Sequence, residues 1–141
     1  SLSDSFCVER HQSSFMQFVG DGVDIVVADE DEANALFETD NFEDTLAALD
    51  GFSNLWVITR SDKGSVIAHG GEIIEHPATP VDDITDTTGA GDAYCAGFLF
   101  GWANDLSLEQ CARYGTYCAT RVIQQLGARI EPGLIDDLES R

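Results

Sequence analysis

Basic side chains are scarce in this 141-residue sequence. Seven Lys and Arg residues stand against 26 Asp and Glu residues, which gives a formal net charge of −19 at pH 7. This charge repels the phosphates of nucleic acids and argues against a nucleic-acid partner. The imbalance is greatest in residues 21–50, which hold eleven acidic residues and no Lys, Arg or His. That stretch predicts a solvated acidic face.

Long hydrophobic runs and paired cysteines are missing as well. No apolar run approaches the roughly 20 residues that a membrane-spanning helix needs, so no membrane partner is expected. Cys7, Cys95, Cys111 and Cys118 show no Cys-x-x-Cys spacing, and the last two share one face of a helical pattern. We expect small buried thiols in a reducing compartment, which predicts a cytoplasmic protein.

The sequence does contain regular strand and helix patterns, and its 43% apolar residues are enough for one domain with a core. Buried strands are expected at residues 23–28 and 55–59, followed by a hairpin of residues 65–69 and 72–76 around Gly70-Gly71. One helix is expected around residues 36–37. Further helices are expected at residues 42–49, 91–103 and 107–126. This alternation predicts an α/β fold with a mainly parallel sheet flanked by helices.

Two helical patterns carry more detailed expectations. The segment 91–103 is apolar nearly all round, so it should be buried, with Trp102 in the core. The next pattern begins at Ser107 with a capping box and continues to Leu126, where Gly127 is placed to end it. Trp56, in a strand pattern, is expected in the core.

Segment 86–92, Asp-Thr-Thr-Gly-Ala-Gly-Asp, lies where a loop becomes the helix of residues 91–103. Glycines let amides approach a ligand, and a first helical turn carries unpaired N–H groups and partial positive charge, which suits a phosphoryl group. Asp92 brings a negative charge to this place, as a base taking a proton from an attacking hydroxyl would. The pattern favours phosphoryl transfer; the alternative is a tight turn in which Asp92 complements the helix.

Residues 86–98 resemble the C-terminal signature of the PfkB (ribokinase-like) family of sugar and nucleoside kinases. The resemblance implies a ribokinase-like fold, ATP and Mg²⁺ as cofactors, Asp92 as catalytic base and Thr88 as a nucleotide-binding residue. It also implies an anion hole, which is formed by the amides of Gly89, Ala90, Gly91 and Asp92. Family members are about twice as long as this chain, so residues 1–141 are expected to be the C-terminal, nucleotide-binding and catalytic portion of one kinase domain.

Segment 59–64 follows a strand and resembles the family's nucleotide loop, usually Thr-x-Gly-x-x-Gly. The resemblance implies contacts with the nucleotide from Thr59, Arg60, Ser61 and Gly64. Ser61 stands where the first glycine is usual. The alternative is an ordinary hairpin turn.

The acidic run of residues 29–32 resembles the family's Asn-x-x-Glu motif, with Asp29 in place of Asn. The resemblance implies that Glu32 helps to hold magnesium, largely through water, which suits the hydration of that ion. The alternative is that these acids complement a helix N-terminus. For family members that use potassium, the resemblance implies Asp86 as an ion ligand; the alternative is an Asp that bonds its own turn.

The resemblance implies ATP-dependent phosphoryl transfer to a hydroxymethyl group of a small molecule, either a nucleoside or a sugar. Residues 1–6, 58–67 and 97–101 are similar to bacterial adenosine-kinase-like members, which favours adenosine. The residues that recognise the acceptor lie mostly in the N-terminal half of such kinases, and a homodimer is compatible with the resemblance. The alternative is a nucleotide-binding fragment or module that performs no chemistry on its own.

Overall fold

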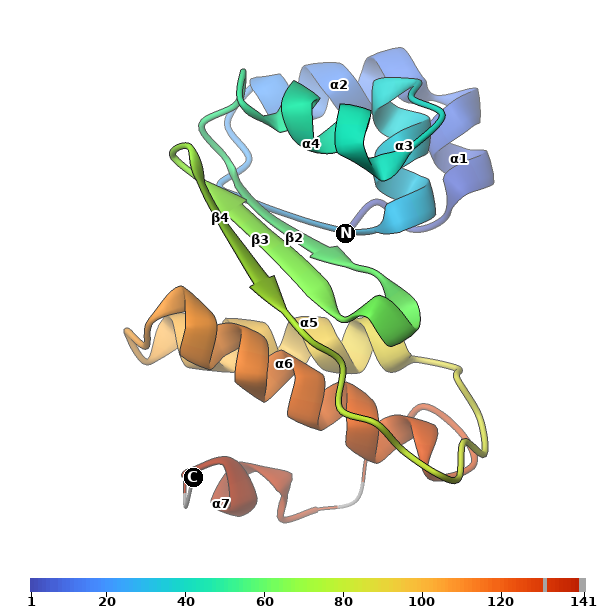
Figure 1. Cartoon of the computed structure of the whole chain (residues 1–141), viewed down its shortest axis with the longest axis vertical. Coiled ribbons are helices and arrows are strands. Elements are labelled where there is room, and N and C mark those ends of the chain that lie inside the picture. The colour runs from blue at the N-terminus through green and yellow to red at the C-terminus, as the bar shows by residue number, and fades with distance from the viewer. Residues whose placement is uncertain (131, 140–141) are drawn as a thin grey trace. The chain divides into compact units, whose positions relative to one another are not determined.

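A computed structural model describes residues 1–130 and 132–139, divided between two compact units, of which the first ends at Glu75 and the second begins at His76. The elements of the first unit (Figure 1) are α1 (Ser5–Arg10), α2 (Gln12–Gly20), β1 (Ile25–Asp29), α3 (Glu30–Phe37), α4 (Phe42–Leu49), β2 (Leu55–Thr59), the 3₁₀ turn η1 (Ser61–Lys63), β3 (Ser65–His69) and β4 (Glu72–His76). The second unit contains α5 (Ala90–Ala103), α6 (Leu108–Ile123) and α7 (Leu134–Glu139).

The four strands form one sheet in the order β1-β2-β3-β4. β1 pairs with β2 in parallel, whereas β2 pairs with β3 in antiparallel fashion. The α/β class is therefore confirmed, and the described sheet is mixed rather than mainly parallel. The reason is the connection between β2 and β3, which holds only η1 and is far too short for the crossover that a parallel pair requires.

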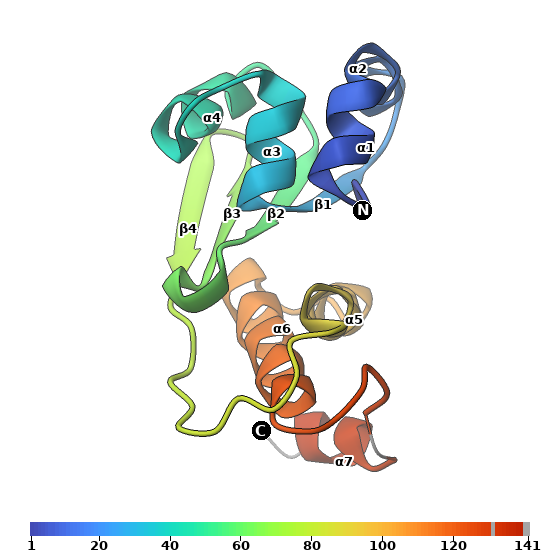
Figure 2. The same ribbon diagram turned by 90° about the vertical axis from the view of Figure 1, so that its right-hand side faces the viewer.

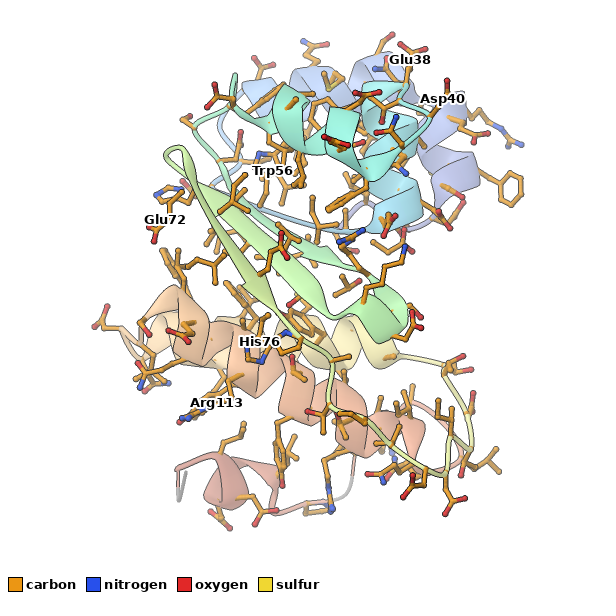
Figure 3. All side chains as sticks on the ribbon, viewed as in Figure 1. Glu38, Asp40, Trp56, Glu72, His76 and Arg113 are labelled. Carbon is orange, nitrogen blue, oxygen red and sulfur yellow. The ribbon has the colours of Figure 1, made fainter. Side chains whose placement is uncertain are left out.

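Helices α1–α4 lie on one face of this sheet (Figures 1 and 2). Side chains of β1, β2 and β3 alternate toward them, because successive residues of a strand point to opposite faces. Trp56 is 1% exposed and points from β2 toward the helices, as Figure 3 shows, so its predicted place in the core is confirmed. The rest of this core comes mainly from one or two residues of each of α1–α4 and β1–β3, including Val8, Val19, Val26, Ala28, Leu36, Leu49, Ile58 and Val66.

In the second unit α5 packs closely along α6 (Figure 2), and this approach requires glycines. A Cβ added at Gly97 would lie 2.5 Å from the carbonyl oxygen of Tyr114 and 2.7 Å from Sγ of Cys118. One turn later, a Cβ at Gly101 would lie 3.1 Å from both Cα and Sγ of Cys111. Cys111 and Cys118 are buried as predicted, and all four thiols of the chain are free.

Two expectations about these helices are wrong. α5 is not buried all round: Leu99 is 39% and Trp102 is 42% exposed, because α6 covers only one face of α5 within this unit. α6 ends at Ile123, and Leu126 is 84% exposed, because Gln124 already leaves the helical conformation with φ −87° and ψ 0°. Within the described residues no helix is long and apolar enough to cross a membrane.

Candidate functional site

Two of the predicted site segments leave the same edge of the sheet. Parallel pairing of β1 with β2 ends at the register pair Asp29 and Thr59. Segments 29–32 and 59–64 therefore emerge side by side from the carboxyl ends of neighbouring strands. Ligands of open α/β sheets bind outside these strand ends. The first unit thus brings the acidic turn and the predicted nucleotide loop together.

The 59–64 loop is closed by its own backbone. The Arg60 amide donates to the Gly64 carbonyl oxygen over 2.7 Å, and the Gly64 amide donates to the Ser61 carbonyl oxygen over 3.2 Å. Ser61 has φ +54° and Gly64 has φ +91°. Glycine adopts a left-handed φ more readily than an L-residue does, which explains why the resembling pattern has glycine at the position of Ser61. Ser61 nevertheless forms the turn.

The Arg60 side chain connects this loop with the first residues of two helices. Its Nε donates to Oε2 of Glu30 over 2.8 Å, and its Cζ lies 4.0 Å from the ring centroid of Phe42. Nζ of Lys63 lies 3.6 Å from Oε1 of the same glutamate. The hydrogen bond from Arg60 lowers the pKa of Glu30. The guanidinium of Arg60 is thus paired within the protein.

Glu32 and Asp29 cap α3 together. The Asp29 amide donates to Oε2 of Glu32 over 3.0 Å, and the Glu32 amide donates to Oδ1 of Asp29 over 2.8 Å, which is a capping box. Glu32 is 8% exposed, and burial raises the pKa of its carboxyl group. These acids therefore do complement a helix N-terminus, and the magnesium role of Glu32 stays a prediction. Across residues 1–130 and 132–139, no group of three or more His, Cys, Asp or Glu is arranged to hold a metal ion.

The start of α5 holds the predicted anion hole and base. Gly89 precedes the helix with φ +79°, and a Cβ there would lie 2.5 Å from Cβ of Ala128, so both conformation and space require glycine. A Cβ at Gly91 would have no heavy atom of the described residues within 4 Å. Asp92 lies in the first turn and is exposed. The Ala90 amide donates to the Thr87 carbonyl oxygen over 3.2 Å, but the first turn receives no side-chain cap and is exposed, so it can accept an anion.

Asp86 ties the loop before α5 to the end of α6. Its Oδ1 accepts from the Thr88 amide over 2.9 Å, and its Oδ2 accepts from the Gly127 amide over 3.0 Å. Hydrogen bonds from Thr88 and Gly127 lower the pKa of Asp86. The bond to Thr88, two residues later, is the turn that the alternative interpretation of Asp86 described. Potassium binding by Asp86 stays a prediction.

The predicted site residues thus form two groups, each assembled within its own unit. The first group is Glu32 with the 59–64 loop, and the second is Asp86 and Thr88 with the 89–92 turn. Sequence reasoning missed several supporting partners, which are Glu30, Phe42, Gly127 (assigned only to ending a helix) and Ala128. One signal was present: opposite charges, Glu30 and Arg60, directly follow two neighbouring strands.

A cavity of about 350 Å³ in the second unit contains none of the predicted site residues. It lies between the end of α6 and α7, and its lining includes Arg121, Gln125, Ile130 and Asp137. This cavity is therefore separate from both groups of predicted site residues.

Three known proteins illustrate what the chain resembles. It is 38% identical over 108 residues to cytidine kinase from Thermococcus kodakarensis, covering 74% of this chain and 38% of that kinase. The crystal structure of adenosine kinase from Sinorhizobium meliloti matches with a TM-score of 0.93 and 42% identity, over 98% of this chain and 42% of that one. A double mutant of fructokinase from Vibrio cholerae, with fructose, ADP and potassium bound, matches with a TM-score of 0.76 and 28% identity, over 90% of this chain and 44% of that one.

The chain therefore spans less than half the length of each of these relatives. The sequence profile of the pfkB family carbohydrate kinases matches residues 3–133, nearly the whole chain. On this match, and with the ribokinase-like fold of its structural relatives, the chain belongs to the pfkB family of carbohydrate kinases.

Proposed function

We propose that residues 1–141 are the C-terminal, nucleotide-binding and catalytic portion of a kinase domain that phosphorylates a hydroxymethyl group with ATP. The span of less than half of each kinase relative supports this division of the domain. The observation that carries the proposal is the exposed first turn of α5, where backbone amides without a side-chain cap and one carboxylate lie together.

Each part of that turn has a role in the proposed reaction. The amides of Gly89, Ala90 and Gly91 stabilise the charge that develops on the transferred phosphoryl oxygens, an interaction whose loss costs about 2.7–4 kcal/mol in comparable sites. Asp92 accepts the proton of the attacking hydroxyl. It can do so without moving far, because the hydroxyl must lie beside the phosphorus atom that it attacks.

The nucleotide is proposed to lie along the 59–64 loop, with Thr59, Ser61 and Gly64 toward its phosphates and ribose. Thr88, in the second unit, is proposed separately as a nucleotide-binding residue. Carboxylate oxygens suit Mg²⁺, so the donor chemistry of the acidic turn fits this ion, with Glu32 holding it through water. Bound magnesium would neutralise phosphate charge. Asp86 is the proposed ligand where potassium is used, which the potassium in the fructokinase relative supports.

Exchanging Gly91 for Ala is expected to leave the free energy of unfolding unchanged or higher, because the added methyl group meets open space and alanine favours a helix. It is expected to lower kcat on the order of 10²-fold, the effect of displacing a reacting group by about 1 Å. Gly89→Ala is the comparison, since it should lower stability by about 1–3 kcal/mol through its contact with Ala128. Thermal unfolding and ADP release measure both. A Gly91→Ala enzyme with full turnover would contradict an anion hole at this turn.

Adenosine is the proposed acceptor, supported by the 42% identity to the Sinorhizobium meliloti adenosine kinase. Coupled ADP release by the complete kinase polypeptide, with adenosine, cytidine, ribose, fructose and fructose phosphates, tests it. We expect kcat/KM for adenosine to exceed that for either free sugar at least about tenfold. Turnover only with a sugar would contradict the proposed nucleoside acceptor but would still support phosphoryl transfer. ATP binding without turnover on any acceptor would favour the non-catalytic module.

A further inference from the structure

We propose that Glu30 is a positioning residue for nucleotide binding, acting through its ion pair with Arg60 to hold the 59–64 loop beside the 29–32 turn. The inference rests on the proposed function of these two segments. Neither the nucleotide nor the magnesium ion needs to touch Glu30 for this role.

The sheet explains why such a support is needed. Backbone pairing between β1 and β2 ends at Asp29 and Thr59. Beyond this pair the two segments diverge into a helix and a 3₁₀ turn, and no ladder bond joins them. Glu30 and Arg60 are the residues that directly follow the two strands, and Nε of Arg60 lies 2.8 Å from Oε2 of Glu30. The ion pair thus joins the 29–32 turn to the 59–64 loop just beyond the last backbone pair of the two strands.

Arg60 is restrained on a second side. Its guanidinium lies 4.0 Å from the centroid of the Phe42 ring, a residue that is 7% exposed and fixed in the core. The side chains of Arg60 and Glu30 are only 20% and 24% exposed, whereas Lys63, at 3.6 Å from the same glutamate, is 59% exposed. A planar guanidinium between a carboxylate and a ring has a defined orientation, which a flexible ammonium does not have. Arg60 is therefore the principal partner of Glu30.

A different role for Arg60 predicts the opposite effect. If the guanidinium bound phosphate directly, Glu30 would compete for it, and Glu30→Gln would release a cation and remove a negative charge near the nucleotide. The KM for ATP would then fall. If Glu30 positions the loop, Glu30→Gln loosens it and the KM for ATP rises. The sign of the change separates the two roles.

The test measures ATP affinity and turnover of the complete kinase carrying Glu30→Gln. We expect the KM for ATP to rise about two- to fivefold, the range that a partly exposed ion pair supports, while kcat changes less than about twofold. Glu38→Gln is the matched control, since it makes the same change at an exposed glutamate at the other end of α3, outside both segments, and its KM should stay unchanged. Arg60→Lys, which keeps the charge but not the planar geometry, should also raise the KM, and it decides the question if Glu30→Gln does not fold.

A double variant, Glu30→Gln with Arg60→Gln, completes the cycle. Positioning through the pair requires that the double variant bind ATP no worse than Arg60→Gln alone, because one interaction cannot be lost twice. An unchanged or lowered KM for Glu30→Gln, or strictly additive effects in the cycle, would overturn the proposal while the kinase still turns over. If the wild-type enzyme binds no ATP, the proposed function itself fails, and this inference fails with it.

Discussion

Asp92→Asn is expected to reduce kcat of the complete kinase by about 10²–10⁴-fold, the contribution of a positioned general base. Asparagine keeps the shape of the side chain but cannot accept the proton of the attacking hydroxyl. The residue is exposed in the first turn of α5, so the substitution removes only a helix-dipole interaction of about 0.3–1 kcal/mol from stability. ATP binding should persist. ADP release and thermal unfolding, measured on the same preparation, separate the two effects.

Asp105→Asn provides the matched control for this experiment. Asp105 is exposed just beyond the other end of α5, so the same change of charge and shape occurs next to the same helix, away from the proposed site. Its kcat should equal that of the wild type. Undiminished turnover by Asp92→Asn would remove Asp92 from the mechanism, whereas equal losses in both variants would trace the effect to the helix or the net charge.

Gly97→Ala is expected to lower the free energy of unfolding by about 1–3 kcal/mol or more, the cost of overpacking a filled interface. The new methyl group would lie 2.5 Å from the Tyr114 carbonyl oxygen and 2.7 Å from Sγ of Cys118. The thiol can rotate, but the carbonyl belongs to the backbone of α6, so the two helices must separate. Denaturant unfolding of the complete kinase measures the change, and ATP turnover should fall only as far as the folded fraction falls.

Gly20→Ala is the comparison. Gly20 is the last residue of α2, and a Cβ there would have no heavy atom of the described residues within 4 Å. The same chemical change should therefore stabilise the protein by about 0.4–1 kcal/mol. If Gly97→Ala were as stable as Gly20→Ala, the close contact between α5 and α6 would be incorrect.

Local patterns were sufficient to predict most elements of the first unit. The predicted bounds are correct for the strands at 55–59, 65–69 and 72–76 and for the helix at 42–49. The signals for these elements, which are apolar spacing, helix caps and Gly70-Gly71, depend only on residues that are close together in the sequence. The exposed Trp102 and Leu126 could not be predicted in the same way. Whether an apolar residue on a helix is covered depends on which other element reaches that face, and the spacing along one helix does not contain this information.

The candidate site likewise has parts that neighbouring residues determine and parts that depend on long-range contacts. The loop-to-helix turn at Gly89–Asp92 and the closed 59–64 loop were predictable, since glycines and chain position define them. The hydrogen bonds of Asp86 to Gly127 and of Arg60 to Glu30 join residues 41 and 30 positions apart. They follow from the register of β1 with β2 and from the return of the chain after α6, and only the folded structure brings these residues together.

The two glycines on the inner face of α5 also differ in how the protein can evolve around them. A Cβ at position 101 would lie 3.1 Å from both Sγ and Cα of Cys111. A smaller side chain at position 111 would remove the first contact, and the second needs a shift of only a few tenths of an ångström, so a paired change is available. At position 97 the nearest obstacle is a main-chain carbonyl, which every amino acid at position 114 would present. No second-site substitution at 114 can remove it. Sequence change at this helix interface is therefore expected to occur as coupled replacements at positions 101 and 111, whereas position 97 is expected to remain glycine.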